Sequence, residues 1–164
     1  MTTTTTTLKR LAVARQTSFA DLSCTIQGTS IRRSRRSFVP FSSTHVVFLL
    51  KVTMPSRRSW QLQCTLRDVV QLHRHLAEST DDAGFIASLA ALQCPKRPLF
   101  RQTNALVVKS MCCELDHYLT NLLKVCQTFA VSSTVPSAMA IETTMRTFFD
   151  PSAAAKPKPA ATKS

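Results

Sequence analysis

The chain has 164 residues, of which 44% are hydrophobic, and its formal net charge is +12. This length and apolar content allow one folded domain with a core of its own. Only two glycines occur, Gly28 and Gly84, so the glycine-rich loops that hold nucleotide phosphates and the GxSxG elbow of hydrolases are excluded.

Positive charge is concentrated in the first part of the chain. Residues 1–58 contain ten Lys or Arg and one acid, Asp21, whereas residues 59–164 contain 11 basic and 8 acidic side chains. Such a surplus favours an acidic partner: an anionic lipid, a nucleic acid or an acidic protein. Residues 1–19, a threonine tract followed by basic residues, predict a disordered arm. A mitochondrial transit peptide has the same composition and is the alternative interpretation.

The segments that follow show strand patterns. Leu22–Ile26 alternates around Cys24 and predicts a strand, and the like-charge run Arg32–Arg36 predicts a loop. His45–Met54 is rich in β-branched and aromatic residues, as central strands are, and Trp60–Cys64 alternates as a returning strand does. This order predicts three antiparallel strands in a meander.

Helical spacing begins after the strands. Apolar residues three and four positions apart predict helices at Arg67–Glu78, Asn104–Cys126 and Pro136–Phe149, and a helical turn or two is expected at Phe85–Leu92. Strands followed by helices indicate an α+β domain over residues 20–150, a three-stranded meander packed against a helical subdomain. Residues 151–164 are rich in Ala, Pro and Lys, and because proline interrupts helices we expect a disordered, solvated tail.

The cysteines and histidines give no sign of a metal or catalytic site. The six cysteines form no CxxC pair and lie among apolar neighbours, which predicts buried free thiols in a reducing, intracellular compartment. His73 and His75 fall on different faces of a helix and cannot chelate together. Cys112 or Cys113 with His117 has no orienting group beyond Asp116. We therefore expect no enzyme activity, no metal and no cofactor.

A membrane-spanning segment is not expected. The longest apolar run, Val46–Leu50, is far shorter than the ~20 residues that a spanning helix needs. Nucleic acid is disfavoured as a partner, because Trp60 and Tyr118 fall on predicted core positions and no zinc finger or RNP string occurs.

Several segments occur together in a characteristic order. The strand His45–Val52 is followed by Trp60–Leu76, which is similar to "RRYSDFxxLHxxL". Cys94-Pro95-Lys96 is similar to a "PPxK" loop, and Glu114–Leu123 to "LExYLxxLL"; Thr147–Phe149 stands where "xxFL" is expected. In these segments, from about Ala20 to Asp150, the chain resembles the phox-homology (PX) domain, the phosphoinositide-binding module of sorting nexins.

The resemblance implies a non-enzymatic module that recruits the protein to membranes, but the chain departs from it at the main phosphate ligands. Thr65 stands where the family has its arginine for the 3-phosphate, and Leu66 where it has the aromatic residue under the inositol ring. Met111 stands at a second family arginine. Threonine cannot replace the two charge-assisted bonds of a guanidinium, so the inherited pocket is expected to be degenerate.

Other basic residues remain as candidates. The candidates are Arg67, Lys96, Arg97 and Arg101 for lipid binding, Leu99 and Phe100 for membrane insertion, and Arg57 and Arg58 for a secondary basic patch. Leu99 and Phe100 have core packing as the alternative, and Arg67 a solvated position in the first turn of its helix.

The expected partner is an anionic phospholipid or phosphoinositide surface, on endosomal or other intracellular membranes reached from the cytoplasm. The alternative function is a PX-like fold that has lost lipid binding and docks a protein partner.

Overall fold

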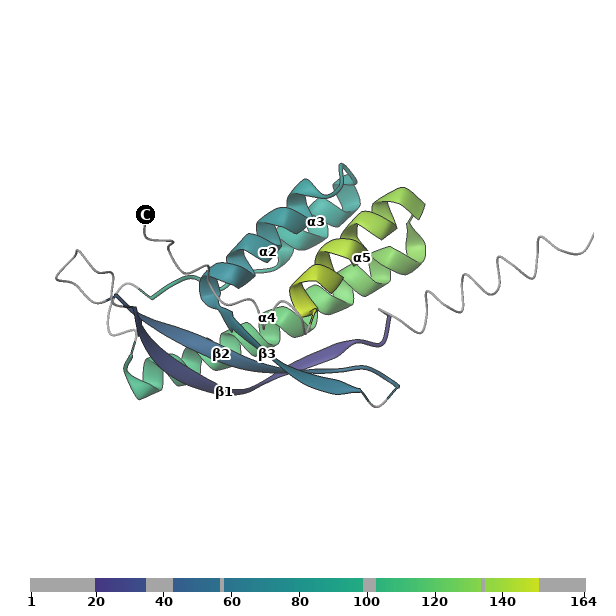
Figure 1. The fold of residues 1–164 in the computed structure, drawn as a ribbon. Coiled ribbons are helices and arrows are strands. Elements are labelled where there is room, and N and C mark those ends of the chain that lie inside the picture. Colours follow the sequence, from purple (N-terminus) through teal and green to yellow (C-terminus); the bar gives the residue numbers. More distant parts are fainter. Residues whose placement is uncertain (1–19, 35–42, 57, 99–102, 134, 151–164) are drawn as a thin grey trace, which may run out of the picture.

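The computed structural model describes residues 20–34, 43–56, 58–98, 103–133 and 135–150. Three strands come first, β1 (Ser23–Ser34), β2 (Ser43–Thr53) and β3 (Ser59–Thr65). The helices follow them: α2 (Leu66–Glu78), α3 (Ala83–Ala91), α4 (Ala105–Ser132) and α5 (Val135–Phe149). The predicted α+β class is confirmed: a three-stranded antiparallel sheet packs against a helical part (Figure 1).

The sheet is a meander in the order β1-β2-β3, and both pairs are antiparallel. Alternate residues of β2 face the core, and Val46, Phe48, Leu50 and Val52 are buried. The register between β1 and β2 shifts between Ile26 and Gly28, which marks a β-bulge. Because side chains alternate between the two faces of a strand, β2 buries one of its faces in the core.

β1 is longer than predicted, and the loop expected over Arg32–Arg36 is wrong at its first residues. Arg32 and Arg33 belong to β1 and pair with His45 and Thr44 of β2. Backbone pairing with β2 extends an edge strand whatever its solvent-facing side chains are, and charged side chains are common there. Arg32 also donates a hydrogen bond across the sheet to Gln63 Oε1 at 2.7 Å. The rest of the run, residues 35 and 36, lies outside the described residues.

The predicted helices all occur, with shifted ends. α4 continues to Ser132, beyond the predicted end at Cys126, because the buried Phe129 packs against Phe85 of α3, with ring centroids 4.7 Å apart. α3 begins where Asp82 caps it: Asp82 Oδ1 accepts a hydrogen bond from Phe85 N at 2.8 Å. Asp82 therefore marks the start of α3, four residues after the end of α2.

The core forms where α4 lies along the sheet (Figure 1). α5 packs against α4, and α2 packs against α5 and β3. The predicted α4 stripe is buried at Leu115, Leu119 and Leu122, and α5 adds Ile141 and Met145. The space between the sheet and this helix is thus filled by core side chains. Among the described residues, no helix combines the length and the apolar character needed to cross a lipid bilayer.

Two long-range hydrogen bonds join the beginning and the end of the domain to its centre. Trp60 Nε1 donates to the backbone carbonyl of Phe149 at 2.9 Å, and Gln127 Nε2 donates to the carbonyl of Leu22 at 2.8 Å. The first bond places the last residue of α5 beside the start of β3.

Candidate functional site

The predicted lipid-binding residues that the structure describes are exposed. Arg67 lies in the first turn of α2, and Lys96 and Arg97 lie in the loop that leads to α4. Arg58 is exposed in the turn between β2 and β3, at the opposite end of the sheet, and so does not join them. The other predicted residues lie outside the described residues: Arg57, Leu99, Phe100 and Arg101.

The structure adds further basic residues to those around Lys96. Thr65, at the end of β3, pairs with Val47 near the start of β2, and the last residues of β1 pair with the first residues of β2. The start of α4 lies at this same end (Figure 1). We call this region the cationic end and define it by its exposed basic residues: Arg32, Arg33, Arg67, Lys96, Arg97 and Lys109.

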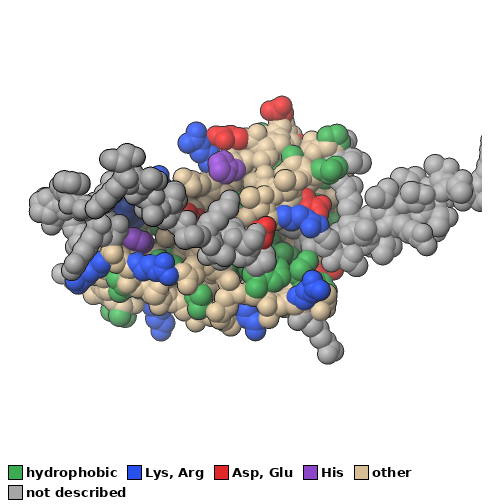
Figure 2. All heavy atoms as spheres, viewed as in Figure 1, with side chains coloured by type: hydrophobic (Ala, Val, Ile, Leu, Met, Phe, Trp, Pro, Cys, Tyr) green, Lys and Arg blue, Asp and Glu red, His purple; other side chains and the backbone are tan. Residues whose placement is uncertain are grey.

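Charge is unevenly spread over the surface. Figure 2 shows Lys and Arg side chains around the left end and along the lower margin, over the sheet, whereas most Asp and Glu side chains of this face lie over the helices, where other Lys and Arg side chains lie beside them. The cationic end also carries two exposed apolar side chains, Leu106 of α4 (78% exposed) and Ile31 of β1 (52% exposed). Sequence reasoning missed both, because each follows the apolar pattern of its own element.

The position matched to the 3-phosphate arginine is occupied by a helix cap. Thr65 N donates to Asp68 Oδ2 at 2.7 Å, and Asp68 N donates to Thr65 Oγ1 at 3.4 Å, which forms a capping box at the start of α2. The Thr65 hydroxyl also donates to Asp68 Oδ2 at 2.8 Å. This side chain is therefore committed to the helix.

Neutral side chains fill the region between α2, α4 and the loop before α4. His73 Nδ1 lies 2.6 Å from the Tyr118 hydroxyl, and Cys94 contacts the same hydroxyl. Burial lowers the pKa of His73 and raises the pKa of Tyr118 and of Cys94. Met111, matched to the second family arginine, is half-buried against the core. His73, Tyr118 and Cys94, which we call the neutral cluster, carry no permanent positive charge for a phosphate, and Met111 carries none either.

A groove of about 700 Å³ opens between the edge of β3, α2 and α5. Its polar lining includes Asp68, Gln71 and Glu78, and hydroxyl groups come from Ser79 and from three threonines of α5, Thr143, Thr144 and Thr147. Ser79 Oγ and Thr144 Oγ1 are 3.1 Å apart, which links the two helices across the groove. No lysine or arginine is among the described residues that line it.

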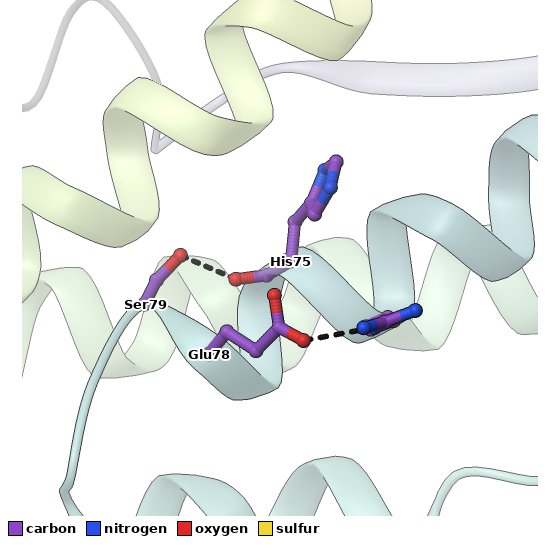
Figure 3. Close-up of polar contacts among 4 residues, drawn as sticks. His75, Glu78 and Ser79 are labelled. Atoms are coloured by element: carbon purple, nitrogen blue, oxygen red, sulfur yellow. Dashed lines mark hydrogen bonds and ion pairs between the residues drawn. The ribbon is translucent and has the colours of Figure 1, made fainter.

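The groove does not assemble a proton relay from Ser79, His75 and Glu78. Figure 3 shows the Ser79 hydroxyl directed at the backbone carbonyl of His75, to which it donates, while the imidazole points away. Glu78 Oε1 instead accepts from Arg74 Nε at 2.8 Å. Without a hydroxyl–imidazole contact, this trio has no activated nucleophile. The serine and threonine content of α5 is the one sequence signal that could have indicated the groove.

The expectation that all six cysteines are buried is wrong in part. Cys24, Cys64 and Cys126 are buried, and burial raises the pKa of each thiol to about 12. Cys113 is exposed. It follows Cys112, which packs against the core, and the next position of the helix faces the solvent. All six thiols are free, and within the described ranges no group of three or more His, Cys, Asp or Glu side chains could hold a metal ion.

Comparison with protein-family models and with curated proteins finds no match to this chain.

Proposed function

We propose that the chain is a PX-like module that associates with anionic membrane surfaces through its cationic end. The observation that carries the proposal is that segments with exposed basic residues meet at this end: the end of β1, the start of α2, and the beginning of α4 with the loop that leads to it. Each such charge near an anionic surface contributes about 1 kcal/mol. The order of three strands and then helices is the one that the resemblance to PX domains implies, which supports the proposal.

Recognition of the surface is expected to depend on charge density rather than on one headgroup. The Thr65 hydroxyl is used by the helix cap and Met111 packs against the core, so neither offers a charged, bidentate contact to a phosphate. Leu106 and Ile31 supply exposed apolar surface beside the cations, as interfacial segments do.

Vesicle sedimentation with the full chain tests this function. We expect equal pelleting with phosphatidylserine and with phosphatidylinositol 3-phosphate at matched surface charge, none with neutral phosphatidylcholine, and a steep loss with added salt. The combined change Arg67→Glu, Lys96→Glu and Lys109→Glu should weaken binding about a hundredfold or more, because three charges worth about 1 kcal/mol each are lost.

Lys124→Glu is the matched control, because Lys124 is exposed on α4 but far from the cationic end. The proposal is wrong if no vesicle pellets the protein at low salt, or if Lys124→Glu weakens binding as much as the triple change. A strong preference for the phosphoinositide at equal charge would contradict recognition by charge density.

A further inference from the structure

The groove is an acidic site on a basic protein. The chain has 21 Lys and Arg against 9 Asp and Glu, yet the described residues lining the groove include Asp68 and Glu78 and no Lys or Arg. Glu78 is paired with Arg74, but both side chains are more than half exposed, at 57% and 78%. An exposed pair of this kind is weak, so the carboxylate can accept a second cation. The groove therefore favours a positively charged occupant.

The groove also exposes a strand edge. β3 is the last strand of the sheet, paired with β2 on one side only. Leu62, Gln63 and Cys64 are consecutive in β3, and all three line the groove. Because side chains alternate between the two faces of a strand, consecutive residues can line one groove only along the strand edge. Such an edge offers backbone groups to an added extended segment.

The chain itself supplies a basic segment whose start lies beside this edge. The carbonyl of Phe149 accepts from Trp60 Nε1 in β3, and Thr147 and Phe148 line the groove. The residues that follow, 151–164, contain Lys156, Lys158 and Lys163 and no acid. Fourteen extended residues span up to about 46 Å, which is ample for a groove beside their point of attachment.

The prolines of this segment are spaced as an edge strand allows. Pro157 and Pro159 are two residues apart, so in an extended chain both lack their N–H on the same edge. In an extended segment the opposite edge would keep the backbone donors of Lys156, Lys158 and Ala160. Lys156 and Lys158 each precede a proline, which favours extended conformations, and side chains two residues apart in an extended segment share one face.

We propose that the groove binds residues 151–164 of the same chain as an extended segment along β3, with Lys156 and Lys158 facing Asp68 and Glu78. The composition of this segment predicts a solvated tail. Composition alone contains no information about the acidic groove that lies beside the point where the segment is attached to α5. Covalent attachment gives the segment an effective concentration of order mM, so weak contacts suffice. The inference does not depend on membrane binding.

Zero-length carbodiimide cross-linking of the full chain, read by mass spectrometry, tests the proposal. The reagent joins an amine to a carboxylate in direct contact, so we expect a link from Lys156 or Lys158 to Glu78 or Asp68 within the monomer. Glu78→Lys should lower the yield of these links about fivefold, because one attraction becomes a repulsion.

Glu142→Lys is the matched control. Glu142 pairs with Arg146 four residues away, as Glu78 pairs with Arg74, but it does not line the groove. The control should leave the links unchanged. Combining Glu78→Lys with Lys156→Glu and Lys158→Glu should restore a link in which the two sides have exchanged amine and carboxylate.

Three results would overturn the proposal. The first is the absence of links between the tail and the groove in the unmodified chain. The second is an equal loss in Glu78→Lys and Glu142→Lys. The third is a link found only between isotopically labelled and unlabelled chains, which would show that the groove takes the tail of a second copy.

Discussion

The cationic end and the groove differ in both charge and shape. The cationic end gathers basic side chains on the outside of the molecule, whereas the groove is hollow. In the described part of the chain, the groove is lined by apolar side chains together with carboxylates, amides, hydroxyls and the imidazole of His75. A pocket for one phosphate headgroup needs cations inside a concavity. The comparison shows that a chain with net charge +12 can separate the two properties, so that its positive charge lies on an outer surface while its hollow favours a cation.

The largest effect is expected where the groove shares residues with the core. Leu72 of α2 lines the groove and is 3% exposed. Leu72→Ala should lower the free energy of unfolding by about 3 kcal/mol, because it leaves a cavity in the core beneath the groove. Urea denaturation measures the loss. Val70→Ala, at a position 45% exposed on the same helix, is the control and should change stability little. A loss from Leu72→Ala as small as the loss from Val70→Ala would contradict the role of Leu72 in the packed core beneath the groove.

A second change would remove the separation of charge and concavity. Thr65→Arg with Met111→Arg returns guanidinium groups to the two positions matched to family arginines. We expect affinity for vesicles with phosphatidylinositol 3-phosphate to rise about tenfold over phosphatidylserine at equal charge, since a bidentate contact becomes available. Loss of the Thr65 cap should cost about 1 kcal/mol of stability.

The matched variant for this experiment is Thr65→Gln with Met111→Gln, which adds length without charge and should show no preference between the two lipids. If the arginine variant shows none either, these positions do not correspond to the phosphate ligands of PX domains. That result would count against the resemblance, while leaving binding by charge density intact.

The smallest effect is expected from pH at the neutral cluster. Burial lowers the pKa of His73 in the folded state below its ordinary value of 6.5, so the unfolded chain binds more protons as pH falls through that value. The free energy of unfolding should therefore decrease from about pH 6.5 downward until His73 is protonated in the folded state as well. His73→Gln should lack this part of the pH dependence in urea denaturation. An unchanged pH profile in the variant would show that His73 is not the group responsible.

Most of the fold could be predicted because it depends on local patterns. The apolar spacing of α2 and α4 and the β-branched run of β2 reappear as the buried residues of the core. The errors arose where a neighbour in space decides. Arg32 and Arg33 are in a strand because they pair with residues of β2. α4 continues beyond Cys126 because its residue Phe129 packs against Phe85 of α3.

The candidate site was predictable only in part for the same reason. Lys96, Arg97 and Arg67 were found as basic residues near motifs, but their grouping with Arg32, Arg33 and Lys109 needs the packing of strands and helices. The groove was not predicted at all, because its lining comes from three elements far apart in the sequence.

The order of strands and helices, the excess of positive charge and the neutral residues at the matched phosphate positions were determined by the amino-acid sequence alone. These features depend on residue type and on spacing over a few positions. Only the tertiary structure decided which charges share an end and where a hollow remains. The bond from Trp60 to Phe149 joins residues 89 positions apart, and a contact at that separation is set by the packing of the whole chain.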